Sequence, residues 1–153
     1  MKRGLIAGLG IVAAGGLWFA LAGDKSQAGT IRLMPGDAAI VAEGADLYAA
    51  HCASCHGVDL QGAPNWQSPN SGGRLPAPPH DASGHSWHHD SATLFALTKL
   101  GVAEMIGDPT YKSDMPAFGE TLTDDQIIAV LSYIKSTWPQ SIRDSHDMRE
   151  DQS

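Results

Sequence analysis

The sequence predicts an all-α fold of three to four helices, and three observations lead to this prediction. Apolar residues recur at helical spacing in three separate segments of the chain. No Asn-Gly or Asp-Gly hairpin turn and no sustained alternation of apolar and polar residues occurs. Residues 57–89 show no convincing regular structure, and a loop of this length is uncommon in so small a domain. A bulky apolar group at the centre of the helices would resolve this conflict.

The first helix is expected between Asp37, which can cap its amino end, and His51. Its apolar residues fall on one face of a 3.6-residue period: Ile40, Val41, Leu47 and Tyr48. Gly44 lies inside this helix, where glycine costs stability. Its presence therefore indicates close packing against another element.

A second helix is predicted from Asp90 or Ser91 to Leu100, with Gly101 at the C-cap position. Its inward residues are expected to be Leu94, Phe95, Leu97 and Leu100. These lie at the spacing of one helical face, so this helix should contribute to the core.

The third helix has the clearest pattern. Thr123 and Gln126 form a capping box at its start, and two aspartates in the first turn suit the helix dipole. Its apolar residues repeat at helical spacing until Pro139 ends the pattern: Ile127, Ile128, Val130, Leu131, Ile134 and Trp138.

The size and charge of the chain limit its possible functions. Its 153 residues suffice for one domain with a hydrophobic core. The 17 acidic residues outnumber the 10 Lys and Arg, and the formal net charge is −7. Because this charge opposes phosphate backbones, nucleic-acid binding is excluded. With only 2 cysteines, the chain is not a disulfide-stapled miniprotein.

The amino-terminal segment, residues 1–23, is expected to form a membrane anchor or a signal peptide. Two positively charged residues precede an uncharged run from Gly4 to Gly23. At about 1.5 Å per residue, this run is just long enough to cross a hydrocarbon core of about 30 Å as a helix. The positive start would stay in the cytoplasm, so the rest of the chain would be exported. Cleavage after Ala22, where small residues suit a signal peptidase, is the alternative.

Three further segments follow. Residues 24–36 are mixed in composition and are expected to form a tether with a short docked end. Residues 37–139 contain the predicted helices and form the folded domain. Residues 140–153 carry many charges and few apolar anchors, so a polar, solvated tail is expected there.

The chemistry of the chain is indicated by Cys52, Cys55 and His56, which form the C-x-x-C-H signature of c-type haem attachment. Near a helical turn this spacing places the three side chains on one side. The two sulfurs can then bond the vinyl groups of one haem while the imidazole reaches its iron. A thioredoxin-like dithiol is expected in a βαβ unit, and a zinc site requires a second pair of ligands at comparable spacing. The sequence provides neither.

Three motifs in this order resemble those of a class I cytochrome c. The first extends from Gly44 to the C-x-x-C-H signature, the second contains Met115-Pro-Ala-Phe, and the third is the helix with Leu131-Ser-Tyr-Ile-Lys. The resemblance covers residues 37–139. It implies the cytochrome c fold, with helices wrapped around one covalently attached haem c.

The resemblance also implies a crossing of the first and last helices at a small residue beside aromatic side chains. It assigns Gly44 and Tyr48 to this crossing on one helix, and Leu131 with Tyr133 or Ile134 on the other. These two helices would exclude water from the haem.

The sixth ligand of the haem iron follows from the same resemblance. Met115 lies just before the last helix, where the family places its axial methionine. A thioether opposite an imidazole raises the reduction potential. Met34 and Met105 are alternative ligands in weaker contexts, and Met115 could instead fill a gap in the core. With Met115 off the metal, the protein would be a haem enzyme or sensor with an open axial site.

Further residues are expected to surround the haem. In the family, a proline carbonyl often accepts the second N–H of the ligand imidazole, and Pro76 or Pro78 could supply it. The haem propionates need hydrogen-bond donors, for which Arg74, Trp87 and Tyr111 are candidates.

A histidine-rich stretch departs from a plain cytochrome. It contains His80, His85, His88 and His89. Such a set could bind Cu(II) or Zn(II) or supply a rival iron ligand, so a periplasmic copper-handling module is an alternative function. We favour a surface loop leading into the next helix, because no helix or hairpin is evident to hold the four side chains in a tetrahedral set.

The sequence therefore predicts an electron carrier and not an enzyme. With His56 and Met115 on the iron, substrate or dioxygen cannot easily reach the metal. By analogy with the family, a quinol-oxidising complex or a dehydrogenase would be the electron donor and a terminal oxidase the acceptor. The expected location is the periplasmic side of the inner membrane, either anchored by the N-terminal helix or soluble after cleavage.

Overall fold

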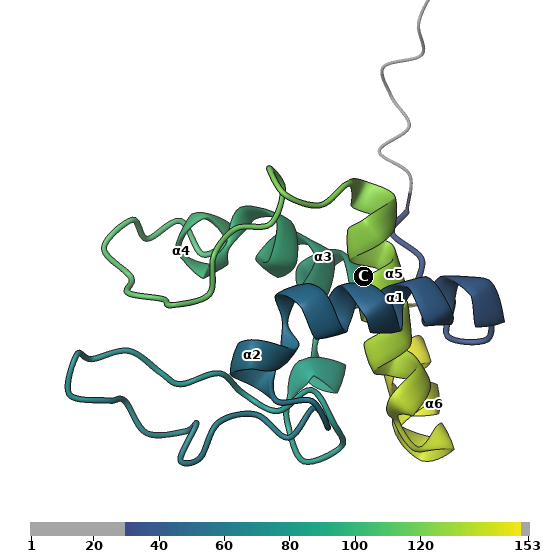
Figure 1. The fold of residues 1–153 in the computed structure, drawn as a ribbon, viewed down its shortest axis with the longest axis horizontal. Coiled ribbons are helices and arrows are strands. Elements are labelled where there is room, and N and C mark those ends of the chain that lie inside the picture. The colour runs from purple at the N-terminus through teal and green to yellow at the C-terminus, as the bar shows by residue number, and fades with distance from the viewer. Residues whose placement is uncertain (1–29, 151–153) are drawn as a thin grey trace, which may run out of the picture.

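Two helices, α1 (Ala38–His51) and α5 (Asp124–Thr137), cross near the middle of the computed structural model (Figure 1). The structure describes residues 30–150, which contain no β-strand. The remaining helical elements are α2 (Ala53–His56), a 3₁₀ turn (Ser86–His88), α3 (Ser91–Leu100), α4 (Val102–Met105) and α6 (Gln140–Glu150). The predicted all-α fold is therefore confirmed. The single-turn helices and α6 bring the number of helices above the three to four expected.

The three helices that the sequence predicts begin and end at the expected signals. Asp37, Asp90 and Thr123 accept hydrogen bonds from the first-turn backbone of α1, α3 and α5. Gln126 completes the capping box of α5 by accepting from the backbone N–H of Thr123. Gly101 ends α3 with a φ of +81°, a conformation that favours glycine. Each signal acts within one helical turn, so the sequence alone reveals it.

The contact between α1 and α5 depends on the absence of a side chain at Gly44. A Cβ atom at this position would lie 2.0 Å from the carbonyl oxygen of Ala129 and 2.9 Å from the Cβ of Tyr133. One turn further along α1, the buried ring of Tyr48 packs against the ring of Tyr133, with centroids 5.5 Å apart. The expected places of Gly44 and Tyr48 are confirmed. Tyr133 makes the contact on α5, and Ile134 is buried in the core.

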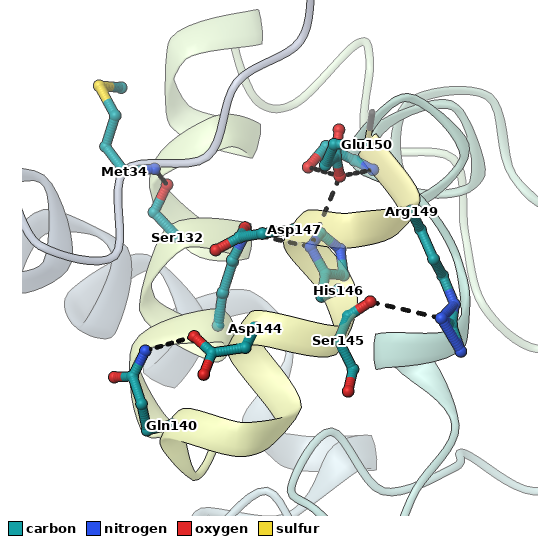
Figure 2. A network of polar contacts seen from close by, with 11 residues as sticks. Met34, Ser132, Gln140, Asp144, Ser145, His146, Asp147, Arg149 and Glu150 are labelled. Carbon is teal, nitrogen blue, oxygen red and sulfur yellow. Dashed lines mark hydrogen bonds and ion pairs between the residues drawn. The ribbon is translucent and has the colours of Figure 1, made fainter. Parts of the chain in front are cut away.

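The described end of the expected tether lies against α5. Leu33 is buried in the core, and the backbone N–H of Met34 donates to the Oγ of Ser132 at 2.9 Å (Figure 2). The expected anchor or signal helix, residues 1–23, lies outside the described residues. Among residues 30–150, the structure contains no helix with the length and apolar character needed to span a membrane.

The expectation of a solvated tail is wrong for Gln140–Glu150, which form α6. The side chain of His146 is completely buried, and its ring lies 5.3 Å from that of Trp138. Its Nδ1 atom lies 3.0 Å from the Nζ atom of Lys135, a buried amine on α5 that also pairs with Asp147. Polar side chains, together with Ile142 packed on the core, thus attach α6 to the domain. A search for apolar anchors could not find this helix.

The far end of α6 is attached to α3. The Glu150 carboxylate accepts hydrogen bonds from the backbone N–H of Ser91 at 2.7 Å and from its hydroxyl at 2.6 Å. The same carboxylate lies 3.5 Å from the Nδ1 atom of His146 on the preceding turn (Figure 2). These contacts place α6 against α3 and α5, where it supports the loop that precedes α3.

We expect Gly44→Ala to lower the free energy of unfolding by about 1–3 kcal/mol, because the added methyl group would meet backbone atoms that cannot move aside independently. Urea denaturation measures this loss. Gly36→Ala is the matched control, since a Cβ atom at Gly36 would meet nothing within 4 Å. Equal stability of the two variants would show that the helices do not need a glycine at their crossing.

The burial of His146 predicts that stability depends on pH. Burial, and then the positive charge of Lys135, lower the pKa of His146, although Glu150, Asp147 and Asp90 act in the opposite direction. The folded-state pKa is therefore below the unfolded value of about 6.5. The folded state favours the neutral imidazole of His146. The folded protein therefore has its full stability above about pH 6.5 and loses part of it as the pH falls below this value. Between about pH 7.5 and 5, the unfolding free energy should fall less in His146→Gln than in the wild type. Parallel pH profiles for the two proteins would contradict this assignment.

Candidate functional site

The C-x-x-C-H signature occupies the sharp turn between α1 and α2. Cys52 ends α1 and starts α2, and its carbonyl accepts hydrogen bonds from the backbone N–H groups of Cys55 at 3.1 Å and His56 at 2.9 Å. Both cysteines are free, with Cys55 exposed and Cys52 partly buried. Burial, and then the neighbouring Cys55, raise the pKa of Cys52 to about 11. One helical turn therefore presents two thiols beside one imidazole.

His56 is held in the form that can bind a metal. Its Nδ1 atom lies 2.8 Å from the carbonyl oxygen of Pro78. Because a carbonyl only accepts, Nδ1 must carry the proton, which leaves the lone pair of Nε2 for a ligand. Burial lowers the pKa of His56, although the hydrogen bond to Pro78 opposes this shift. The neutral imidazole is therefore favoured. Of the two prolines considered from the sequence, Pro78 supplies the carbonyl.

Tyr48 connects α1 to the chain that follows the signature. Its hydroxyl donates a hydrogen bond of 2.9 Å to the carbonyl oxygen of Gly57, and its ring is 2% exposed. Burial raises the pKa of Tyr48 above its ordinary value, so the hydroxyl stays protonated and can donate. The aromatic residue at the helix crossing thus also fixes the end of the attachment turn.

The four histidines of the histidine-rich stretch do not converge on one point, although the rings of His85 and His89 meet with centroids 5.6 Å apart. The ring of His80 stacks on that of His56, with centroids 4.0 Å apart, whereas His85 stacks on Trp66 and His88 on Trp87. In the part of the chain that the structure describes, no group of three or more His, Cys, Asp or Glu side chains could hold a metal ion. The structure gives no support to a copper site formed by this stretch. It also moves His80 from the expected surface loop to the interior.

Met115 lies in the loop between α4 and α5, partly buried against the hydrophobic core that Cys52 also contacts. Its backbone N–H donates to the Oγ of Ser113 at 3.1 Å. The end of the loop is held on α3, because Phe118 and Gly119 donate backbone hydrogen bonds of 3.0 Å to the last turn of that helix. The loop is thus anchored close to Met115.

The two competing methionines occupy other places. Met34 is 37% exposed and lines a pocket of about 260 Å³ between α1 and α5. None of the residues of the C-x-x-C-H signature lines this pocket. Met105 lies at the end of α4. Neither competitor is among the partly buried residues that pack on the hydrophobic core, whereas Met115 and Cys52 both are.

The three expected propionate donors differ in their availability. The indole N–H of Trp87 already donates to the carbonyl of Gly84 at 3.1 Å. Tyr111 is 38% exposed. The Nε atom of Arg74 lies 3.0 Å from the carboxylate of Asp114 but has no well-directed hydrogen bond, although it is buried. A buried donor of this kind fits an anionic group.

The surroundings of the signature fit a large apolar cofactor. Several large apolar side chains are exposed on α3 and on the loops beside α2 and α4: Val58, Leu75, Leu100, Ile106 and Tyr111. Figure 1 shows α2, α4 and the two long loops on the same side of the α1–α5 crossing. Exposed apolar residues that gather on one side of a domain are typical of a binding surface. Together with two thiols, a neutral imidazole and the buried Nε atom of Arg74, they define a helical domain suited to covalent haem.

A family comparison agrees with this site. The protein-family model described as Cytochrome c matches residues 41–138. Because the match covers more than half of the chain, the protein belongs to the cytochrome c family, in agreement with the class I resemblance. Its cofactor is therefore one covalently bound haem c. No curated protein and no solved structure matches the chain.

We expect Tyr48→Phe to lower the free energy of unfolding by about 0.5–1.5 kcal/mol, because it removes the hydroxyl that donates to Gly57 and keeps the ring. Tyr133→Phe is the matched control, since within residues 30–150 the Tyr133 hydroxyl makes no hydrogen bond. Denaturation of both variants in urea measures the difference. Equal losses would show that the Tyr48 hydrogen bond contributes nothing specific.

Proposed function

We propose that the protein carries single electrons in an extracytoplasmic respiratory chain. Cys52 and Cys55 hold the haem through two thioether bonds, and His56 and Met115 are the axial ligands of its iron. The observation that carries this proposal is the hydrogen bond of 2.8 Å between His56 Nδ1 and the Pro78 carbonyl. It leaves Nε2 as a lone-pair donor one helical turn from two free thiols.

The arrangement of these residues suits electron transfer better than bond-making chemistry. The bound haem supplies an iron that alternates between Fe(II) and Fe(III). With His56 and Met115 as its two protein ligands, the iron would be closed to substrate and dioxygen and would transfer electrons only. The α1–α5 crossing contributes buried aromatic and aliphatic side chains that exclude water. Apolar surroundings make the charged ferric state less favourable relative to the ferrous state, so they raise the reduction potential.

The proposal extends to the location and partners of the protein. Residues 1–23 support an anchor in the inner membrane with the domain on its periplasmic side, or a soluble periplasmic form after cleavage. Suitable partners are a quinol-oxidising complex or a dehydrogenase as donor and a terminal oxidase as acceptor. The net charge of −7 favours docking on a basic surface, with association that weakens as salt rises.

The attachment is tested by extracting the denatured protein with acidified acetone and recording its pyridine haemochrome spectrum. The haem should stay with the wild-type polypeptide, because thioether bonds survive denaturation. Haem that leaves with the solvent would overturn the proposal.

Met115→Ala should abolish the methionine-to-iron charge-transfer band of the oxidised protein and lower its reduction potential, because the thioether ligand favours the ferrous state. Met105→Ala is the matched control and should keep both properties. If the wild-type protein lacks the band, the open-site enzyme or sensor is favoured. A band that survives in Met115→Ala would assign the sixth ligand to another residue.

A further inference from the structure

The ring of His56 packs against a second imidazole, that of His80. The rings of His56 and His80 stack with their centroids 4.0 Å apart and their planes inclined by 23°. This separation is close to van der Waals contact between two flat rings. One face of the His56 ring is thus covered by His80, and the Nδ1 atom of His56 is held by the Pro78 carbonyl.

His80 is itself fixed from several directions. Its backbone N–H donates to the carbonyl of Leu60 at 2.7 Å, and its own carbonyl accepts from the indole N–H of Trp138 at 2.8 Å. In the side chain, Nδ1 lies 2.9 Å from the Oγ of the buried Ser86. The ring of Tyr48 meets that of His80 edge-on, with centroids 6.2 Å apart. The ring is therefore held by α1 and the 3₁₀ turn, and the backbone of His80 is held by the residue that ends α5.

These contacts limit the rotation of His56. A hydrogen bond at one ring atom restrains that edge but still allows the plane to tilt about it. The stacked ring of His80 restricts this tilt. Tilting in one direction would make the His56 ring clash with His80, and tilting in the other would lose the dispersion contact between the two rings. Residues outside the first ligand shell commonly orient a ligand imidazole in this way.

We propose that His80 is a positioning residue that fixes the plane of the His56 imidazole over the haem. This inference rests on the proposed function, since it takes His56 as an axial ligand. The orientation of a ligand imidazole sets the splitting of the iron d orbitals, so it determines the g values of the oxidised haem in electron paramagnetic resonance. His80 therefore acts on the iron through His56 and not by direct contact.

The test compares His80→Phe with His80→Leu in the full haem-loaded protein. Both residues are somewhat larger than histidine and so leave no cavity, but only phenylalanine offers a flat ring. We expect His80→Phe to keep the wild-type g values, and His80→Leu to give shifted g values or a second set of signals from a less constrained imidazole. His89→Leu is the matched control, because His89 contacts His85 and not His56.

Each outcome decides the inference. Unchanged g values in His80→Leu, or equal shifts in both His80 variants, would overturn it, since the flat ring would then have no specific effect. If His80→Leu does not retain haem, Ser86→Ala replaces it. That variant leaves the ring but removes its tether, and unchanged g values would again overturn the inference. A wild-type protein without low-spin, six-coordinate haem would instead contradict the proposed function.

Discussion

The haem site depends on how closely α1 and α5 approach each other. At Gly44 the two backbones meet without an intervening side chain. Because α1 leads directly into Cys52, this approach sets where the attachment turn begins. At the other end of the crossing, α5 leads to Trp138, whose indole holds the carbonyl of His80. The crossing of α1 and α5, two segments far apart in the sequence, thus fixes the position of the attachment turn relative to the residues that support His56.

The loops around the site have little structure of their own and depend on a few polar contacts. The carbonyl of Pro78 accepts the hydrogen bond of His56. Two residues later, His80 fixes this segment through hydrogen bonds with Leu60, Ser86 and Trp138. α6 supports the same region through the ring of His146, which lies 5.3 Å from that of Trp138. In such a framework a buried polar group that loses its partner is costly, so the loss of one contact also affects its neighbours.

The parts of the site that local patterns predicted are those built within one helical turn. The C-x-x-C-H signature and the caps at Asp37 and Thr123 belong to this class. Local patterns did not predict α6, because a buried histidine and a buried lysine anchor it and it has no apolar stripe. The position of His80 was not predicted either, since no local pattern reveals that a loop histidine will stack on another 24 positions away.

By itself the sequence determined the helical class, the attachment signature and the identity of the cofactor, because these depend on spacing within short segments. Only the tertiary structure decided between Pro76 and Pro78, brought Tyr133 to Gly44 and set His80 against His56. These choices depend on contacts between residues distant in the chain. Their geometry follows from the packing of whole elements, and the pattern of any one segment does not contain it.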